Sequence, residues 1–268
     1  MDVNYKGAVP IRHHIAHTRE VMANLNLVFR LFLLCLVCVG PFQPTAAQPA
    51  DTSSVAVNPQ LTAEQVVQNL VRRNQERAQA LHAYRGIRIY RLEYRGFPGT
   101  RNAEMIVDVK YESPRTKEFT IQSTSGSKLI IDKVFKRLLQ SEKEALEADN
   151  QQRTALTNDN YTFHMLGYEP MATGPAYVLS VEPRTREKFL YHGRIWVDAT
   201  DFAVVQIEAE PSKNPSFWMK NADVEHLYEK VSDFWLPAHN HSVTNVRLGG
   251  RAELTIDYKD YQITATSR

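Results

Sequence analysis

Two short motifs in this sequence have residue types and spacings that could do chemistry. The first, Ser125-Gly126-Ser127-Lys128, has the S-x-x-K spacing that places a lysine one helical turn after a nucleophilic serine. Gly126 inside the motif and the β-type run Leu129-Ile130-Ile131 after it disfavour a helix. A polar hairpin turn is therefore the stronger interpretation.

The second motif is a pair of histidines that a metal ion could use. His239 and His241 are two residues apart, so on a strand both rings point to the same side. A third ligand would have to come from His164, His192 or His226, and the spacing favours none of them. Polar side chains on the outer face of a strand are the better-supported interpretation, and we predict no metal site.

Other catalytic signatures are missing from the sequence. It has no G-x-S-x-G turn, no phosphate-binding G-x-x-x-x-G-K-[ST] loop and no G-x-G-x-x-G motif. Carboxylates such as Glu93, Glu104, Asp108 and Asp198 are interspersed with lysine and arginine, as on solvated strand faces. We predict a protein that is not an enzyme, without catalytic residues or cofactor; a hydrolase with a site hidden from sequence is the remaining alternative.

Residues 1–47 have the form of a secretory signal with an N-terminal extension. Arg30 precedes the apolar run Leu31 to Gly40, and Thr45-Ala46-Ala47 supplies small residues for cleavage. The run is shorter than the roughly 20 apolar residues that span a bilayer. Cleavage after Ala47 would remove both cysteines, Cys35 and Cys38. We expect an exported, periplasmic protein with neither a disulfide nor a reactive thiol.

Three other interpretations of the apolar segment remain open. It could stay uncleaved as a membrane anchor, because Leu25 to Val39 nearly suffices for a tilted span. A lipoprotein signal is disfavoured because Leu34 and Val37, which precede the two cysteines, are not small. A core helix is disfavoured by the proline-rich exit at Pro41 and Pro44. Membrane contact is thus either transient or made through an uncleaved anchor.

The charge balance disfavours one class of partner. The chain holds 32 basic and 30 acidic residues, and removing the four basic and two acidic residues of 1–47 leaves 28 of each. A neutral chain lacks the basic surface that phosphate backbones require. We therefore predict no nucleic-acid partner.

The rest of the chain predicts one mainly antiparallel domain, 61–265, after a disordered linker, 48–60. Thr62 and Gln65 form a capping box for an amphipathic helix. From Ile87 onward the apolar period is mostly two, interrupted by a second helix that Asp132 would cap. We expect an α+β fold with about eleven strands, curled into an incomplete barrel whose concave face is covered by two amphipathic helices.

One apolar cluster is expected at the surface. Phe217, Trp218 and Met219 follow Asn214-Pro215-Ser216 in an expected loop or strand start, where large apolar side chains indicate a cavity rim or a partner contact. The alternative is that Trp218 closes one end of the sheet.

The order of these segments resembles a known superfamily. After the signal and helix come Tyr84-Arg85-Gly86 and Tyr111 to Phe119, then the hairpin beginning Gly193-Arg194-Ile195-Trp196-Val197-Asp198 and the strand Asp233-Phe234-Trp235-Leu236-Pro237. This is similar to the outer-membrane lipoprotein-sorting proteins, the LolA/LolB/RseB-like group, over Leu61 to Ile263. The resemblance implies an open half-barrel with helices as a lid over an apolar cavity, in proteins that carry lipoprotein acyl chains or sense envelope lipids or proteins.

The resemblance also leaves points open. The helix from Asp132 to Glu147 is longer and more charged than expected there, and the basic residue that regulates the carrier's cavity is not assigned to Arg88, Arg91 or any other arginine. We expect a periplasmic carrier or sensor whose partners are acyl chains of a lipoprotein or lipid. An envelope-stress module that holds an envelope protein is the alternative. The residues expected to line the cavity are Val67, Leu70, Met105, Val107, Val109, Phe119, Ile121, Leu138, Leu139, Tyr177 and Leu179.

Overall fold

The structure is a computed structural model that describes residues 61–187, 189–213, 219–246 and 249–266. The expected signal and linker, residues 1–60, lie outside this part of the chain, as do Phe217 and Trp218 of the apolar cluster. Met219, the third member of that cluster, is the first residue of a strand. The expectation for the cluster therefore stays a prediction.

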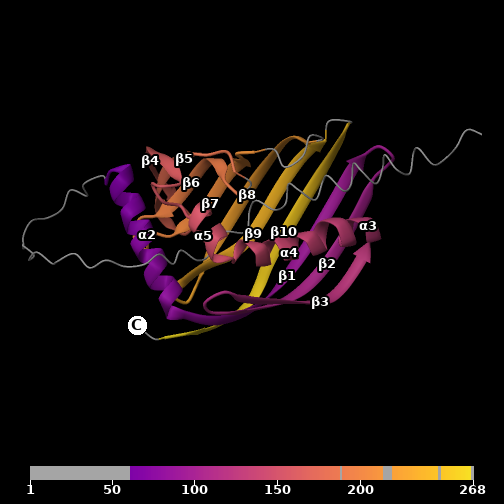
Figure 1. The fold of residues 1–268 in the computed structure, drawn as a ribbon, viewed down its shortest axis with the longest axis horizontal. Coiled ribbons are helices and arrows are strands. Elements are labelled where there is room, and N and C mark those ends of the chain that lie inside the picture. The colour runs from indigo at the N-terminus through magenta and orange to yellow at the C-terminus, as the bar shows by residue number, and fades with distance from the viewer. Residues whose placement is uncertain (1–60, 188, 214–218, 247–248, 267–268) are drawn as a thin grey trace, which may run out of the picture.

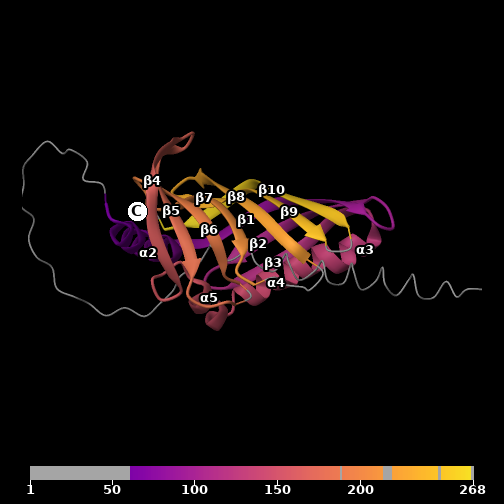
Figure 2. The same cartoon turned by 90° about the horizontal axis from the view of Figure 1, so that it is seen from above.

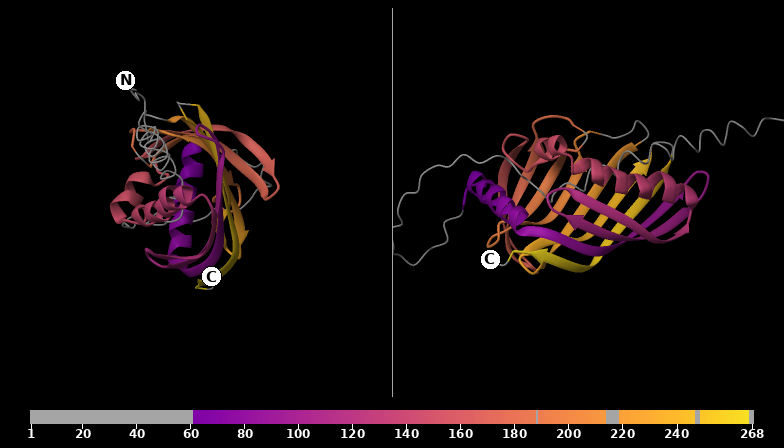
Figure 3. Two further views of the ribbon diagram at one scale, coloured as in Figure 1. Left: turned by 90° about the vertical axis from the view of Figure 1, so that its right-hand side faces the viewer. Right: turned by 60° about the horizontal axis from the view of Figure 1, so that its bottom comes forward.

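The described strands form a single antiparallel sheet of ten strands (Figure 1). Their spatial order is β3-β2-β1-β10-β9-β8-β7-β6-β5-β4. The first and last strands in sequence, β1 and β10, therefore pair in the interior of the sheet, and β3 and β4 are its two edge strands. Figure 3 shows the sheet curling without closing, which confirms the predicted incomplete barrel. The strands are β1 (Leu81–Gly96), β2 (Arg101–Glu112), β3 (Thr116–Gly126), β4 (Tyr161–Met171), β5 (Gly174–Pro183), β6 (Tyr191–Asp198), β7 (Val204–Pro211), β8 (Met219–Val231), β9 (Phe234–Val246) and β10 (Gly250–Ala265).

Helix α2 (Ala63–Ala80) begins at the predicted capping box. The backbone N–H of Gln65 donates to Thr62 Oγ1 at 3.3 Å, and the N–H of Thr62 donates to Gln65 Oε1 at 2.9 Å. These bonds satisfy two of the donors that a helix N-terminus leaves free. Figures 1 and 2 both place α2 at the end of the sheet that β4 forms. The buried residues of α2 belong to the same apolar cluster as those of β4.

The second helical region begins earlier than predicted and runs along one face of the sheet (Figure 2). It comprises α3 (Lys128–Ile130), the π-helical turn η2 (Ile131–Phe135), α4 (Lys136–Ala145) and α5 (Ala148–Thr154). Leu129-Ile130-Ile131, expected as a strand, is helical, which reduces about eleven strands to ten. The cause is tertiary: Ile130 and Ile131 are buried against the sheet, and this contact overrides their β propensity.

Buried apolar side chains form two separate clusters on this sheet. The first lies between β1, β2, β10 and both ends of β9 on one side and α3, η2 and α4 on the other, and we call it the lid cluster. The second lies between α2 and strands β4 to β7, and we call it the α2 cluster. Each cluster joins a different helix group to a different half of the sheet, so the two halves have separate covers.

The two segments that carry the family resemblance meet in the folded chain. Asp198 Oδ1 accepts hydrogen bonds from the backbone N–H groups of Thr200 and Asp201, which closes the turn after β6. Asp201 Oδ2 then accepts from Trp235 Nε1 at 2.9 Å and pairs with Lys230 at 2.6 Å. These residues therefore form a structural corner between two hairpins.

The junction between β3 and α3 depends on Gly126, the last residue of β3, and this dependence can be tested by substitution. Gly126 has φ +82°, and a Cβ there would lie 2.4 Å from the carbonyl oxygen of Asn102. We predict that Gly126→Ala lowers the free energy of unfolding by about 1–3 kcal/mol, measured by urea denaturation. Gly167→Ala is the control, because a Cβ there meets nothing within 4 Å; an equal loss in both variants would contradict the argument.

Candidate functional site

The concave face of the sheet is the side that the helices cover, and the ladder register defines its residues. Met105, Tyr90 and Ile256 are cross-strand neighbours, and the row continues through Asn240 and His226. All five side chains are buried. Side chains that alternate with them, such as Arg91, Glu104 and Asp257, point to the convex face. The sheet therefore has one covered face and one charged, hydrated face.

The residues predicted to line one cavity lie in two places. Met105, Val107, Val109, Leu138 and Leu139 belong to the lid cluster, and Phe119 packs at its margin. Val67, Leu70, Tyr177 and Leu179 belong to the α2 cluster. Ile121 is opposite Val107 in the ladder, but it is 39% exposed because β3 is an edge strand. The structure thus divides the expected lining between the two halves of the sheet.

A buried group of three charges lies inside the lid cluster, and we call it the ion triad. Arg88 of β1 donates two hydrogen bonds to Glu142 of α4, from Nη1 to Oε2 at 2.5 Å and from Nη2 to Oε1 at 3.0 Å. Lys117 of β3 donates to Glu142 Oε1 at 2.5 Å. The three side chains are 4%, 2% and 6% exposed, in the order Arg88, Glu142 and Lys117. One carboxylate on the lid helix is therefore held by two cations on the sheet.

The ionised form of Glu142 is strongly favoured in this position. Burial by itself would raise the pKa of this carboxyl, but the charges of Arg88 and Lys117 and their hydrogen bonds outweigh it and hold the pKa below its ordinary value. Burial would likewise lower the pKa of Arg88, but the Glu142 charge keeps the pKa well above its ordinary value. Arg88 and Glu142 are therefore both charged over the whole physiological range.

Aromatic rings surround the guanidinium of Arg88. Its central carbon lies 4.9 Å from the ring centroid of Tyr258 and 5.8 Å from that of Phe119. Tyr90 OH lies 3.4 Å from Arg88 Nη1, and burial raises the pKa of Tyr90 to about 12. With both tyrosine hydroxyls protonated and the carboxylate doubly paired, none of these groups is placed to accept a proton at neutral pH. The arrangement holds a helix in place rather than transferring protons.

Sequence reasoning did not assign Arg88, although a signal for it is present. Arg88 is in phase with Tyr90, Leu92 and Tyr94, the buried set of β1, whereas Arg91 is in the opposite phase. Arg91 pairs with Glu104 at 2.9 Å and with Asp257 at 2.5 Å on the convex face. A cation in the apolar phase of a strand predicts a buried partner, but its identity depends on tertiary contacts.

The paired histidines lie on the convex face and each has a carboxylate neighbour. His239 Nδ1 is 2.8 Å from Asp257 Oδ1, and His241 Nε2 is 3.0 Å from Glu253 Oε1. Among the described residues, no group of three histidine, cysteine or acidic side chains is placed to hold a metal ion. Ser125 and Lys128 also do not form a catalytic pair one helical turn apart, because Ser125 lies in β3, which ends at Gly126, and Lys128 starts α3.

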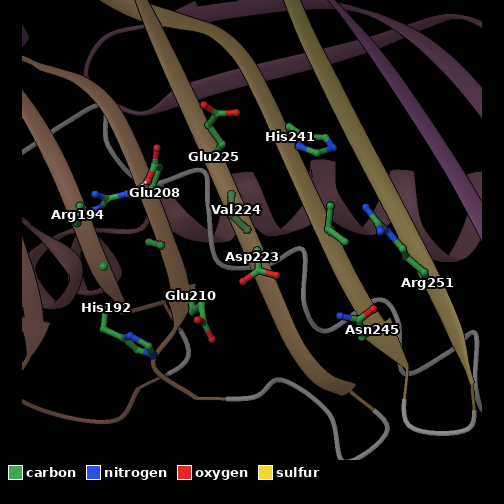
Figure 4. Close-up of a pocket in the computed structure, with 13 residues that line it drawn as sticks. His192, Arg194, Glu208, Glu210, Asp223, Val224, Glu225, His241, Asn245 and Arg251 are labelled. Atoms are coloured by element: carbon green, nitrogen blue, oxygen red, sulfur yellow. Dashed lines mark hydrogen bonds and ion pairs between the residues drawn. The ribbon is translucent and has the colours of Figure 1, made fainter.

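An open hollow of about 660 Å³ lies on the same convex face. Figure 4 shows His192, Arg194, Glu208, Asp223, Glu225 and Arg251 spread over the strands that form it. Its polar side chains stand apart along the strands, and Arg194 is already paired with Glu208. We therefore place the candidate site on the concave face, at the ion triad.

Comparisons with known proteins give only distant similarities. No family model and no curated protein matches the chain. One similar solved structure is a DUF1329 family protein from Desulfovibrio piger ATCC 29098, with 11% identity and a TM-score of 0.38 over 77% of this chain and 95% of that one. A second is a putative outer membrane lipoprotein-sorting protein domain from Vibrio parahaemolyticus, with 11% identity and a TM-score of 0.36 over 77% of this chain and 95% of that one. A third is the LolA superfamily protein NE2245 from Nitrosomonas europaea, with 10% identity and a TM-score of 0.31 over 77% of this chain and 96% of that one. They include the group that the sequence resembles, but such low values assign no activity and no partner to this chain.

The ion triad predicts a pH dependence that one variant should remove. Because the pKa of Glu142 is lower in the folded chain than in the unfolded one, its stabilising contribution is present above the unfolded value, about 4.3, and is lost as pH falls through the folded value. We predict that Glu142→Gln lowers the free energy of unfolding at pH 7 by about 3–5 kcal/mol, because two buried cations lose their partner.

The measurement is urea unfolding of both proteins between pH 3 and pH 7. Glu104→Gln is the control, because it breaks an exposed pair on the convex face, and it should cost less than about 1 kcal/mol. Equal losses in the two variants, or a wild-type curve below pH 4.5 with the same slope as Glu142→Gln, would contradict a charged ion triad.

Proposed function

We propose that this chain is a periplasmic, non-enzymatic carrier or sensor that binds acyl chains on the concave face of its open sheet. The observation that carries the proposal is the ion triad, which fastens a lid helix over an apolar face by charges rather than by apolar contacts alone. We take residues 1–47 as an export signal, 48–60 as a linker and 61–265 as the binding domain. None of the helices in the described part of the chain is long and apolar enough to span a membrane.

The concave face has the chemistry that acyl chains require. Its side chains in the lid cluster are Tyr90, Leu92, Met105, Val107 and Ile256, all at most 4% exposed. Burying one methylene of an acyl chain contributes about 0.8 kcal/mol, so chains of ordinary length bind an apolar face without any charged contact. The lid residues Leu138 and Leu139 now occupy positions that such chains would compete for.

The ion triad is suited to a cover that opens. Desolvating buried charges costs free energy that an apolar contact of the same size would not, so a buried ion pair is a weak stabiliser but one with strict geometry. When α4 lifts from the sheet, water solvates all three charged groups, which offsets much of the Coulomb energy that is lost. An apolar contact has no such compensation. The ion triad therefore gives two defined states, closed and open, with a moderate difference in free energy.

Opening of the lid is tested by binding of a fluorescent fatty-acid methyl ester, a neutral acyl probe, to the purified protein. We predict that Lys117→Met, which leaves the Arg88–Glu142 bonds in place but removes one cation, raises the association rate of the probe about tenfold, because the lid opens more often. Stopped-flow fluorescence measures this rate, and Lys110→Met is the matched control, because it breaks an exposed pair with Glu112.

Each result separates the candidate functions. Slower probe association in Lys117→Met would contradict the lid role of the ion triad. Absence of probe binding in both proteins, together with no lipid in organic extracts of natively purified protein, would overturn the carrier proposal. That result would favour an envelope-stress module that holds a protein. Hydrolysis of an offered acyl ester would instead indicate an enzyme.

A further inference from the structure

A column of polar side chains runs down the middle of the concave face. Asn240, Ser242 and Thr244 alternate along β9, the strand next to β10, and they are 4%, 3% and 0% exposed. On a sheet face filled mostly by apolar side chains, three consecutive inward positions on an interior strand are thus polar. We call these three residues the β9 column.

The neighbours of the column across the sheet are mostly apolar. Ser242 lies between Val224 of β8 and Leu254 of β10, and Thr244 lies between Ala222 and Ala252. Asn240 lies between His226 and Ile256. The column and His226 lie on β9 and β8, between the β10 residues of the lid cluster and the β7 residues of the α2 cluster. This explains why one continuous concave face carries two separate clusters.

The hydroxyl groups here lack hydrogen-bond partners among the described residues. Ser242 Oγ, Thr244 Oγ1 and, on the adjacent strand, Tyr258 OH are each buried without one. Buried hydroxyls are nearly always satisfied in folded proteins, because leaving one unpaired costs the full desolvation penalty of the group. Three such groups on neighbouring strands of one face point to a polar partner that binds there.

The chemistry of these groups selects the partner. Hydroxyls donate to a carbonyl oxygen, and neither the column nor Tyr258 carries a charge. Arg88, the cation of this face that lies beside Tyr258, already has a bidentate carboxylate partner in Glu142. A phosphate or a free carboxylate would therefore be desolvated without a counter-charge, whereas a neutral ester would not.

We infer that the β9 column is a hydrogen-bonding subsite for the ester groups of a glycerol-linked acyl lipid. Its chains extend from the column toward the lid cluster on one side and the α2 cluster on the other. The inference rests on the proposed function and names its ligand class: neutral, ester-linked diacyl lipids rather than free fatty acids.

The experiment compares two lipids that differ only in the atoms the column would bind. The probes are 1,2-dioleoylglycerol and its ether analogue, which lacks both carbonyl oxygens, and each is titrated against a bound fluorescent fatty-acid methyl ester. We expect the wild type to prefer the ester by about tenfold or more, as two hydrogen bonds of ordinary strength would give. In the double variant Ser242→Ala/Thr244→Val the preference should fall to within twofold, with affinity for the ether unchanged.

Controls keep the three outcomes distinct. Thr255→Val, on the opposite face of β10, should keep the wild-type preference, and the unfolding midpoint of the double variant should not fall, because it removes hydroxyls that have no partner. Equal binding of ester and ether by the wild type would overturn the subsite and leave the carrier intact. Binding of neither lipid would overturn the proposed function itself.

Discussion

An open, curled antiparallel sheet exposes one concave apolar face, and the rest of this chain is organised around covering it. The described strands pair in sequence order except where β1 meets β10, so β3 and β4 form opposite edges of the sheet and none of these ten strands closes the barrel. Burial of the concave side chains then depends on helices. Helix α2 covers one end and α3 to α4 cover the other, each through its own cluster. The stability of the domain is thus divided between two covers that need not open together.

The two covers differ in the forces that hold them. Helix α2 is fixed at its start by the capping box and near its end by Arg77, which donates to the carbonyl oxygens of Asp201 and Phe202 at 2.9 and 3.0 Å. These contacts join α2 to the corner formed by Asp201 and Trp235. Helix α4 instead depends on Leu138, Leu139 and a carboxylate that must stay charged in an apolar setting. This physical contrast is the reason for proposing that α4, rather than α2, is the cover that opens.

Local patterning was enough to predict the strands and the first helix, because their signals are period-two alternation and a capping box. The second helix was predicted to begin at Asp132, but that residue lies inside η2 and pairs with Lys136. Propensity favoured a strand at Leu129–Ile131, and only packing of Ile130 and Ile131 against the sheet reverses it. The candidate lining was named from apolar phase alone, which cannot show that Val67 and Met105 belong to different clusters. Nor can phase identify Glu142 as the partner of Arg88, since 54 residues separate them.

The ion triad and the β9 column are connected through one side chain. The centroid of the Tyr258 ring lies 4.9 Å from the guanidinium carbon of Arg88. The same ring is stacked with the ring of His226, at a centroid distance of 6.1 Å. His226 in turn is the cross-strand neighbour of Asn240, the first residue of the column. A ligand that hydrogen-bonds Tyr258 OH therefore acts on the ring that supports Arg88, and any shift of that ring changes the geometry of a bidentate pair with strict angular demands. Under the two proposals, occupation of the column and closure of α4 are equilibria coupled through Tyr258, and binding linkage then requires that each alters the other by the same factor.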